Sequence, residues 1–471
     1  MGSSATVPKA QPGFWRSVRD GIAGVPQDYT RLPIGRAITL LAVPMVLEMM
    51  MESLFNIVDV FWVARLGSDP VGSVALTESL LTPVFIVAMG LSLATTAFVA
   101  RRIGENDAEG AANGAVQAII IGLLVSLLSG AAGVVWAADL LRIMGATPAI
   151  VAAGRRFTSI LLGGSASIVM LFLINAIFRG AGDAAIAMRV LCFANLINLA
   201  LDPCLIFGLG PFPRLGVAGA AVATTIGRGC GVLYQLALLS GGNSRIVVRS
   251  RHVRIDWRVI ARLLRISGNG MLQLLISMGS WMALVRMIAM FGGAALTAYV
   301  ISIRIVIFFI LPSWGMSNAA ATLVGQNLGA GEPDRAEKSV WITSFYNAAF
   351  LGAIGVLFLV FAGPLTGFFS HDPDVAPLCV ASLRILAAGN ICYAVGMVTI
   401  QAFNGAGDTF TPTVLHFFAY WVIQLPLAWI VGAHGAWGPK GVILAVPVAE
   451  TVLAVASVAV FRRGKWKLVK I

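Results

Sequence analysis

The amino-acid sequence predicts an all-α polytopic membrane protein with twelve transmembrane helices, arranged as two six-helix lobes related by a pseudo-two-fold axis along the membrane normal. Three observations lead to this prediction. Of the 471 residues, 58% are hydrophobic and only 11% are charged, whereas soluble domains carry about 25% charged residues. Apolar stretches long enough to cross a bilayer recur along the chain, and its second half repeats motifs of its first.

Twelve apolar stretches have the length of a tilted transmembrane helix. Short links rich in Gly, Pro and Asp separate them. The stretches cover about residues 38–65, 72–99, 112–137, 153–178, 186–208, 216–240, 267–291, 295–323, 340–362, 379–403, 412–432 and 440–461. An even number of spans places both ends of this chain on one side of the membrane.

The net charge of +12 follows the positive-inside pattern of membrane proteins. Most of the 33 Lys and Arg residues fall in segments that share one side of the membrane if the N-terminus is cytoplasmic. No basic face alternates with stacking aromatic residues, so we expect no nucleic-acid partner. The charge distribution predicts a multi-pass protein of the inner (plasma) membrane with both termini in the cytoplasm.

An internal repeat divides the chain into halves. The segment FRGAGD at 178–183 returns as FNGAGD at 403–408, an offset of 225 residues. Because each half holds six spans, both halves cross the membrane in the same direction. The same offset superposes four further pairs of glycines without a gap: Gly67 on Gly292, Gly90 on Gly315, Gly104 on Gly329, and Gly164 on Gly389.

The repeat and the charges predict five segments. These are a cytoplasmic N-terminal tail (1–37), an N-lobe with helices 1–6 (38–240), a basic cytoplasmic linker (241–265), a C-lobe with helices 7–12 (266–463) and a cytoplasmic C-terminal tail (464–471). The linker holds seven arginines. From Ile255 onward its apolar residues follow helical spacing, which predicts a helix on the inner membrane surface that links the lobes.

The first span carries acidic side chains on one face. At 100° per residue, Glu48, Glu52 and Asp59 fall within about 40° of one another. Asn56 lies on the flank of the same stripe. Each ionised carboxylate at mid-membrane depth costs roughly 2.5–3.5 kcal/mol. This face is therefore expected to point at water, at partner groups or at a bound cation.

The two halves keep intramembrane charge in different places. The acids of the first half and their uncharged counterparts at the offset of 225 are Glu48 and Gln273, Glu52 and Ser277, Asp59 and Leu284, Glu78 and Ile303, and Asp202 and Leu427. The second half instead holds Arg286 and Arg304, and Glu450 is its only acid within a span. A purely structural duplication gives no reason for this difference, whereas a cation-coupling site in the first lobe does.

Asp202 has sequence neighbours that suit a cation. Asn198 lies one helical turn earlier on the same face, and Pro203 frees a backbone carbonyl beside the acid. Thr224 and Thr225 in span six could add hydroxyls, although for each of them the favoured interpretation is a hydrogen bond to a neighbouring helix. Such a site could bind a proton or ligate Na⁺. The alternative for these acids is a static ion pair, for example between Glu78 and Arg304.

Other motifs predict structure rather than chemistry. The GAGD loops follow no strand and lack the lysine of a phosphate-binding loop. We interpret them as tight turns in which Asp183 and Asp408 cap the next helix. The five cysteines and four histidines show no disulfide or metal-ligand spacing. No nucleophile–base pair is present either, so the sequence predicts no enzyme and no cofactor beyond a coupling ion.

Four motifs resemble the multidrug and toxic compound extrusion (MATE) family, and the similarity runs from about residue 35 to 460. They are NIVDVFWVARLG at 56–67, LDPCLIFGLG at 201–210, GVAGAAVAT at 216–224 and the doubled FxGAGD. The resemblance implies a V-shaped pair of six-helix lobes around a central cavity. It implies export of amphipathic, often cationic organic compounds in exchange for Na⁺ or H⁺. It also implies that Asp59 and Asp202, with Asn198, form the cation site of the first lobe.

The second lobe departs from part of this family. Some members carry an acid in span seven and another in span ten. Here the region around Ser277 and residues 383–403 contain no acid. The departure concentrates the prediction on the first lobe and favours H⁺ over Na⁺ as the coupling ion.

The sequence therefore predicts a secondary active multidrug antiporter that works by alternating access of two lobes. Its H⁺ or Na⁺ site comprises Asp59, Asp202 and Asn198, and we expect small organic substrates, a lipid bilayer and a monomer. Two alternatives are a flippase for lipid-linked oligosaccharides and an exporter of organic anions, both suggested by the intramembrane arginines. Additional cavity residues are expected to be Glu48, Glu52, Asn56, Glu78, Thr224, Arg286 and Arg304.

Overall fold

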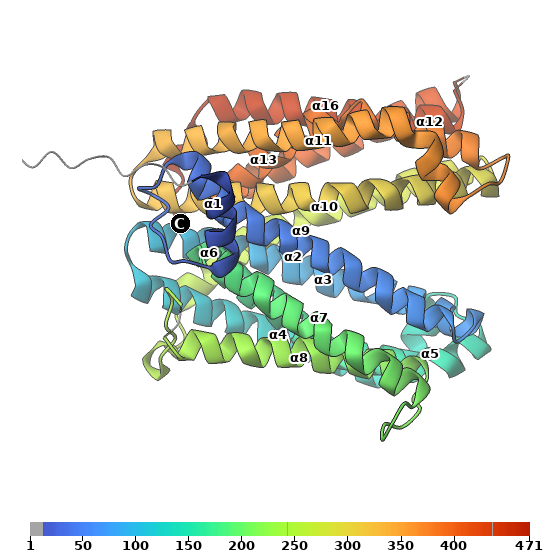
Figure 1. Cartoon of the computed structure of the whole chain (residues 1–471), viewed down its shortest axis with the longest axis horizontal. Helices are drawn as coiled ribbons and strands as arrows, with labels where there is room; N and C mark the ends of the chain where they lie inside the picture. The colour runs from blue at the N-terminus through green and yellow to red at the C-terminus, as the bar shows by residue number, and fades with distance from the viewer. Residues whose placement is uncertain (1–12, 243, 436) are drawn as a thin grey trace, which may run out of the picture.

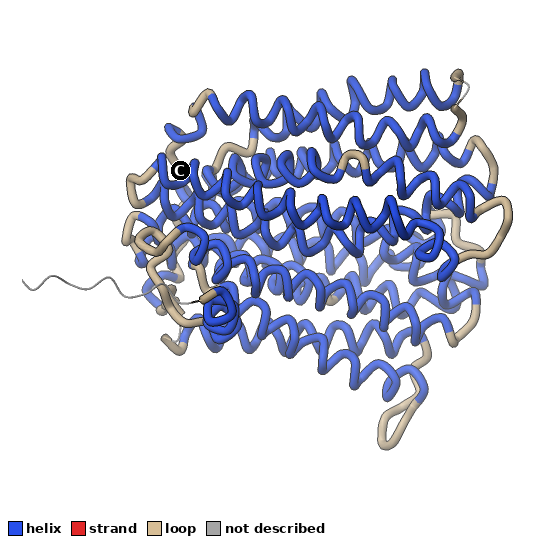
Figure 2. The backbone as a smooth tube through the Cα atoms, turned by 45° about the horizontal axis from the view of Figure 1, so that its top comes forward, coloured by secondary structure: helices blue, strands red, loops and turns tan. Residues whose placement is uncertain are grey.

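The computed structural model describes residues 13–242, 244–435 and 437–471, apart from the side chains of residues 55–60, 64, 68, 69 and 433. This part of the chain contains helices and no strand (Figure 2). A short helix, α1 (Phe14–Ala23), comes first. The other helices of the first half are α2 (Ile34–Ala64), α3 (Ser68–Gly104), α4 (Ala108–Ile143), α5 (Pro148–Gly163), α6 (Ser165–Ala181), α7 (Ala184–Phe207) and α8 (Val217–Ser240).

The second half repeats this order of long helices after a single turn of 3₁₀-helix, η1 (Ser250–His252). One of its membrane-length helices, from Phe410 to Gly432, is built partly from the π-helical turns η2 and η3. The elements of the second half after η1 are α9 (Trp257–Ala289), α10 (Gly293–Gly329), α11 (Pro333–Phe369), α12 (Ala376–Ala387), α13 (Asn390–Ala406), α14 (Phe410–His416), η2 (Phe417–Gln424), α15 (Leu425–Leu427), η3 (Ala428–Ala433), α16 (Pro439–Arg462) and the 3₁₀-helix η4 (Lys465–Leu468).

Within the described residues, ten helices are long and apolar enough to cross a membrane. The bent pairs α5–α6 and α12–α13, with angles of 41° and 53°, raise the number to twelve if each pair is one span. The two bends fall at the equivalent glycines Gly164 and Gly389. A Cβ on Gly389 would lie 2.6 Å from the Cβ of Pro447, so this bend needs a residue without a side chain. The predicted all-α, twelve-span fold is confirmed.

The long helices form two groups that meet at one end and diverge toward the other (Figure 1). We call the end that holds α1, Gly104 and Trp466 the basal end. The distal end is the opposite one, with the turns at Gly145 and Gly292. The helices α5 and α12 lie on different arms at the distal end (Figure 1). The arrangement has the V shape that the family resemblance implies.

One pair of close glycine contacts between the halves follows the pseudo-two-fold symmetry. A Cβ on Gly90 of α3 would lie 3.0 Å from the carbonyl oxygen of Ser267 in α9. A Cβ on the equivalent Gly315 of α10 would lie 2.8 Å from the carbonyl oxygen of Met45 in α2. Small residues let helix backbones approach in this way. The second helix of each half therefore packs against the first helix of the other half.

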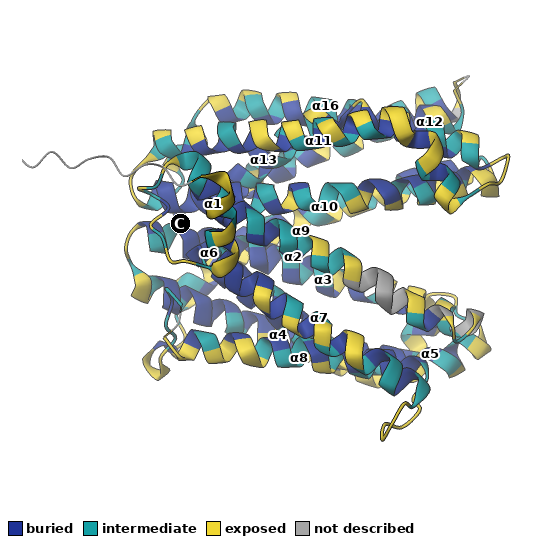
Figure 3. Ribbon diagram, in the orientation of Figure 1, coloured by how far each residue is buried: buried dark blue, intermediate teal, exposed yellow. Residues whose placement is uncertain are grey.

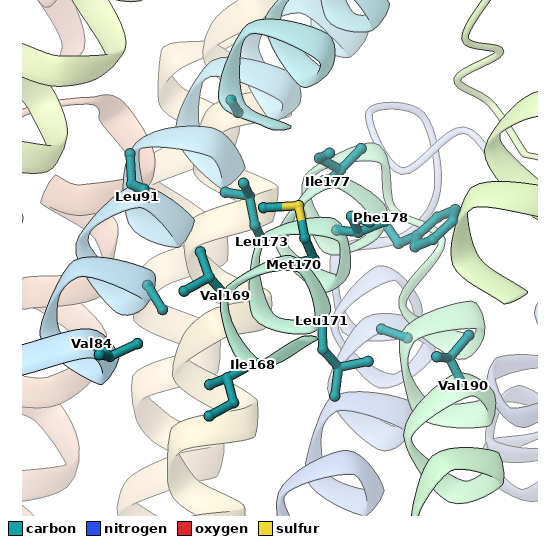
Figure 4. Close-up of a cluster of buried hydrophobic side chains, with 14 of the residues drawn as sticks. Val84, Leu91, Ile168, Val169, Met170, Leu171, Leu173, Ile177, Phe178 and Val190 are labelled. Atoms are coloured by element: carbon teal, nitrogen blue, oxygen red, sulfur yellow. The ribbon is translucent and has the colours of Figure 1, made fainter. Parts of the chain in front are cut away.

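The core of the first half forms around α6, most of whose residues are buried. Val84 and Leu91 of α3 lie beside Ile168 and Val169 of α6 in this core (Figure 4). The outer helix α11 instead shows exposed residues along its length, and α8 shows them from Ile226 onward (Figure 3). This distribution is typical of helices whose outer faces contact lipid.

Both GAGD loops form tight turns, as predicted. Gly182 and Gly407 adopt the left-handed conformation, with φ of 88° and 86°, where a residue without a Cβ is favoured. After the second loop, Asp408 caps the next helix: its Oδ1 accepts a hydrogen bond from the backbone N–H of Thr411 at 3.1 Å. The repeat thus preserves the turn.

The predicted capping role of Asp183 is wrong. Its side chain makes no capping hydrogen bond to α7. Instead, Oδ2 accepts hydrogen bonds from the Ser244 hydroxyl at 2.9 Å and from the backbone N–H of Arg245 at 3.0 Å. Ser244 and Arg245 belong to the linker, which passes close to the first GAGD loop. Asp183 therefore anchors the linker instead of capping α7.

In contrast to our expectation, the described residues of the linker form no separate surface α-helix, only the 3₁₀ turn η1. The helical pattern that starts near Ile255 belongs to α9, which begins at Trp257 and continues without a break to Ala289. Asp256 begins this helix as its N-cap, and its Oδ1 accepts hydrogen bonds from the backbone N–H groups of Arg258 at 3.0 Å and Val259 at 3.3 Å. No proline interrupts residues 257–289, so the segment expected on the membrane surface and the span that follows it form one helix.

Residues 465–471 lie at the basal end between the two halves. Trp466 is 1% exposed and stacks on Phe461 of α16, with ring centroids 4.7 Å apart. Farther along, the carbonyl oxygen of Val469 accepts a hydrogen bond from Arg101 of α3 at 3.1 Å. This segment therefore connects the second half to the first.

Candidate functional site

The centre of the candidate site is Asp202, which is fully buried in α7. Asn198 lies one turn earlier on the same face of this helix and is 2% exposed. Its Nδ2 donates a hydrogen bond to the hydroxyl of Thr224 in α8 at 3.1 Å. The Oδ1 of Asn198 is buried and has no hydrogen-bond partner among the described residues. Three of the predicted site residues thus lie together.

Pro203 interrupts the backbone hydrogen bonding of α7 beside the acid. Because proline has no backbone N–H, the carbonyl of Leu199 lacks its usual helical donor. This carbonyl comes directly after Asn198 in the chain. A carboxylate, an amide oxygen and a free carbonyl therefore gather on one stretch of α7, which is a donor set that suits a proton or a small cation.

Asp59 and Asn56 lie in α2, and their side chains are outside the described residues. Their helix is held against α7, because Nδ2 of Asn195 donates to the carbonyl oxygen of Met51 at 3.4 Å. Both helices run from the basal to the distal end. Counted from this contact at about 1.5 Å per residue, Asp59 lies about 12 Å and Asp202 about 10 Å farther along. The two backbone positions are therefore at similar depth.

Glu48 is 2% exposed and takes part in an ion pair. Its Oε1 accepts hydrogen bonds from Nη1 of Arg179 at 2.8 Å and from Nδ2 of Asn175 at 3.1 Å, both in α6. The Oδ1 of Asn175 in turn accepts a hydrogen bond from Gln235 of α8 at 2.6 Å. Three helices share this network, so the contacts of Glu48 favour a structural role.

The Glu48–Arg179 pair did not emerge from the sequence. The fourth predicted span ends at residue 178, which leaves Arg179 in the loop that follows it. In the structure Arg179 belongs to the last turn of α6, and its side chain is 11% exposed. The signal that could have revealed the pair is the lone arginine in the first repeat, since the second repeat has Asn404 there and Gln273 opposite Glu48.

Glu52 and Glu78 interact with arginines at longer range. Glu52 of α2 interacts electrostatically with Arg228 in α8, and Glu78 of α3 interacts in the same way with Arg304 in α10. Among the described residues, neither acid forms an ion pair within 4.0 Å. Glu78 and Arg304 are both exposed and belong to different halves. The side chains of Glu52 and Glu78 are therefore less constrained by their partners than the side chain of Glu48.

Arg286 of α9 is exposed as well, like Arg304. Among the described residues, no acidic side chain lies within 4.0 Å of either guanidinium. The two intramembrane arginines are thus available to a negatively charged group.

A small cavity of about 40 Å³, lined in part by polar side chains, lies where the halves meet. Ser92 and Thr96 of α3 line it from one half, and Asn318 of α10 and Asn404 of α13 from the other. Arg179 borders the same cavity. A volume of this size holds only about one water molecule. This cavity is therefore too small to hold an organic compound. No group of three or more His, Cys, Asp or Glu suited to a metal ion occurs in the described residues.

A comparison with protein-family models gives one match, to the family MatE. It covers residues 44–204 and 271–430, one block in each half of the chain. The two blocks correspond to the sequence repeat. Together they make up more than half of the protein.

Two relatives with curated names cover nearly the whole chain. A "FAD transporter" from Shewanella oneidensis is 24% identical over 90% of this chain and 93% of its own length. A "Probable multidrug resistance protein NorM" from Thermotoga maritima is 25% identical over 92% of this chain and 93% of its own. The similarity therefore extends over the full fold.

Solved structures show the same architecture. A crystal structure of a MATE protein in complex with MaL6 superposes with a TM-score of 0.86 at 25% identity, covering 94% of this chain and 98% of that one. A transporter from Pyrococcus furiosus, titled for the reverse polarity of its binding pocket, reaches 0.87 at 25% identity and covers 96% and 99%. A MATE transporter in an outward-facing conformation reaches 0.86 at 26% identity, covering 92% and 96%.

Proposed function

Because this chain belongs to the MATE family of transporters, whose members are not enzymes, we propose that it is a secondary active antiporter. It exports amphipathic, cationic organic compounds in exchange for H⁺ or Na⁺. The two lobes, residues 38–240 and 266–463, alternate between an opening on each side of the membrane. The chain acts as a monomer in the inner (plasma) membrane, with the basal end in the cytoplasm.

The observation that carries this proposal is the burial of Asp202. Its side chain is 0% exposed within a membrane-length helix. An ionised carboxylate at this depth costs several kcal/mol unless a proton, a cation or a partner group compensates it. Asn198, Thr224 and the adjacent α2 helix with Asp59 supply the rest of the ion site.

Ion binding drives transport because it favours one arrangement of the lobes. A proton or Na⁺ at Asp59 and Asp202 shifts the equilibrium only if it binds one arrangement better than the other. The glycine contacts at the basal end stabilise the arrangement that is closed there. Release of the ion and binding of the substrate then favour the opposite opening.

H⁺ is the favoured coupling ion. Spans seven and ten lack acids, so a second oxygen-rich Na⁺ site in those spans has no carboxylate to hold it. Asp202 and its neighbours on α7 need only one proton to become neutral. Na⁺ requires several oxygen ligands in a defined geometry, by analogy with other hard cations.

The proposal is tested with the purified protein in liposomes, with the pH and Na⁺ gradients set separately and the fluorescent cation ethidium as substrate. We expect Asp202→Asn and Asp59→Asn to lose gradient-driven transport by at least roughly tenfold, since one coupled charge is worth about 2.3 kcal/mol per 100 mV. Asp139→Asn, on an exposed ion pair with Arg142, is the matched control and retains wild-type transport.

Wild-type rates in Asp202→Asn liposomes would refute the proposed ion site. Transport that continues without a pH gradient but stops without Na⁺ would reverse the choice of ion. Inward accumulation of ethidium under both gradients would contradict export.

A second candidate function is the export of organic anions. It rests on the exposed guanidinium groups of Arg286 and Arg304 and on the relatives named for FAD and for a reversed pocket polarity. The same liposomes test it with FAD in place of ethidium. Under this alternative, FAD is transported and Arg304→Gln lowers FAD transport while Arg384→Gln, an exposed arginine on α12, does not.

A further inference from the structure

The second half contains an acid that the ion site of the first half does not use. Glu450 lies in α16, about halfway along this helix. Its Oε1 accepts a hydrogen bond from the hydroxyl of Tyr420 in η2 at 2.9 Å. The carboxylate also interacts electrostatically with the Tyr393 hydroxyl of α13. Three helices of the second half therefore meet at this acid.

Glu450 forms no ion pair with a basic side chain of the described residues. Among the described residues, none of the ion pairs within 4.0 Å includes it. Glu48, by contrast, is held by the guanidinium of Arg179. A static ion pair explains Glu48 but not Glu450. A carboxylate at this depth with only hydroxyl donors requires a mobile positive charge to reach neutrality.

The local backbone singles out the same place. Tyr420 belongs to the π-helical stretch of residues 417–424. π-Helical turns are rare and occur frequently at functional sites, because they rotate side chains out of the regular α-helical register. Two other side chains of this stretch also make hydrogen bonds to α9: Gln424 accepts from Ser280 at 2.7 Å, and Trp421 donates to the Ile276 carbonyl at 3.0 Å.

The equivalent positions in the first half carry no such arrangement. At the offset of 225, Glu450 corresponds to Thr225 and Tyr420 to Asn195. The Thr225 hydroxyl donates to the carbonyl of Ala221 within its own helix, at 2.8 Å. The Glu450–Tyr420 contact is therefore not a feature that the fold requires of both repeats.

We propose that Glu450 is a second proton-binding site, in the second half of the protein, and that it is loaded and unloaded during the transport cycle. This deepens the proposed antiport function and rests on it. The proton comes from the solution on one side, binds a Glu450 oxygen and leaves to the other side. Ionised Glu450 accepts the hydrogen bond of Tyr420. Protonated Glu450 becomes a hydrogen-bond donor itself, so the contact between α16 and η2 changes with the protonation state of Glu450.

The groups that can influence this site come from every neighbouring helix. Tyr420 donates to the carboxylate, Tyr393 interacts with it electrostatically, and the hydroxyl of Tyr393 accepts a hydrogen bond from Trp314 of α10 at 3.3 Å. His416 of α14 packs against the Tyr420 ring at 5.2 Å, with its Nδ1 directed to the Pro412 carbonyl at 2.7 Å. The arginines of the adjacent helices, Arg286 of α9 and Arg384 of α12, are exposed and form no ion pair with Glu450.

The test measures protons released when ethidium is added to the full-length protein in weakly buffered detergent solution. We expect Glu450→Gln to release about half as many protons per bound ethidium as the wild type, because one of two sites no longer carries a proton. Tyr420→Phe keeps the carboxylate, so it releases the wild-type number but at a shifted pH midpoint. Glu337→Gln, at the basal end of the same half, is the matched control.

Release from Glu450→Gln that equals that of the wild type would overturn the inference. So would release by the wild type that appears only when Na⁺ is present, or a pH midpoint in Tyr420→Phe identical to that of the wild type. If the wild type releases no protons and its transport ignores the pH gradient, the proposed antiport itself fails. If Glu450→Gln does not fold, Tyr420→Phe alone decides.

Discussion

Gly104 of α3 lies so close to Gln326 of α10 that a Cβ on Gly104 would stand 2.0 Å from the Gln326 carbonyl oxygen. Gly329 stands in the same relation to the carbonyl oxygen of Arg101, at 2.2 Å. Cβ atoms essentially never approach other heavy atoms closer than 3.0 Å. The two halves are therefore joined at the basal end by direct contact between backbones.

We predict that Gly104→Ala weakens the basal contact and shifts the protein toward a basal opening. The added methyl group cannot fit without moving α3 and α10 apart. The measurement is the rate of maleimide labelling of a cysteine placed at Thr96, which lines the small cavity between the halves, in a variant without the five native cysteines. The labelling rate should rise several-fold.

The control for this prediction is Gly268→Ala. Gly268 is also helical and lies near the basal end in α9, but a Cβ there would meet nothing within 4 Å. This variant should label like the parent and gain about 0.5–1 kcal/mol in helix stability. Equal labelling of Gly104→Ala and the parent would show that the glycine contact does not hold the basal end closed.

The buried pair of Glu48 and Arg179 should be essential for stability. Glu48→Gln leaves the Arg179 charge without its counter-charge, and breaking a buried pair typically costs about 3–5 kcal/mol. We expect a clear drop in the thermal unfolding midpoint in detergent. The double variant Glu48→Leu, Arg179→Leu removes both charges and should regain much of the loss.

The exposed pair of Asp139 and Arg142 provides the comparison for this pair. Because water screens it, Asp139→Asn should change the unfolding free energy by less than about 1 kcal/mol. An unchanged midpoint in Glu48→Gln would instead indicate that the Glu48 carboxyl is already neutral. Glu48 would then return to the list of candidate ion-coupling residues.

Trp466→Ala should destabilise the basal end of the second half. The ring is 1% exposed, and its Nε1 donates to the Phe461 carbonyl at 2.9 Å. Truncation of a buried Trp typically costs about 3–5 kcal/mol, measured here as a loss in unfolding free energy. Trp437→Ala removes the same side chain from a site that is 59% exposed and should have little effect. Equal losses in both variants would contradict the role assigned to residues 465–471.

The N-cap of α9 should stabilise the protein in a pH-dependent way. The backbone N–H of Val259, the Asn113 amide and the N–H of Arg258 hold the pKa of Asp256 below its usual range. A lowered folded-state pKa stabilises the protein above the unfolded-state pKa of about 3.9, and this stabilisation is lost as the pH falls through the lower folded value. Asp256 therefore contributes fully at neutral pH.

We expect Asp256→Ala to cost about 1 kcal/mol at pH 7 through the lost cap. The difference from the wild type should shrink below about pH 4, where the Asp256 carboxylate of the unfolded chain takes up a proton before that of the folded protein. Thermal unfolding midpoints of both proteins at pH 7 and at pH 3 check this. A difference that stays constant down to pH 3 would show that the charge of Asp256 makes no contribution.

Much of the candidate site could be predicted from local sequence. Helical spacing places Asn198 and Asp202 on one face of a single helix, and this face depends on nothing outside α7. The contact of Asn198 with Thr224 joins two helices that follow one another in the chain. Short-range geometry was therefore sufficient to propose this part of the site.

The partners of the other acids could not be predicted in the same way. Glu48 and Glu52 share a stripe on α2, yet Glu48 meets Arg179 on α6 whereas Glu52 lies within reach of Arg228 on α8. Likewise, Asp183 and Asp408 occupy identical motifs and bind different donors. These choices depend on which distant segment packs nearby.

The sequence by itself determined the number of apolar spans, their repeat and the positions of the acids within the spans, because these follow from hydropathy, spacing and residue identity along one segment. Only the tertiary structure decided that Glu48 is held by an arginine while Glu450 is not. That difference arises because a charge at membrane depth is neutralised by groups far away in the chain, and helix packing alone brings them within reach.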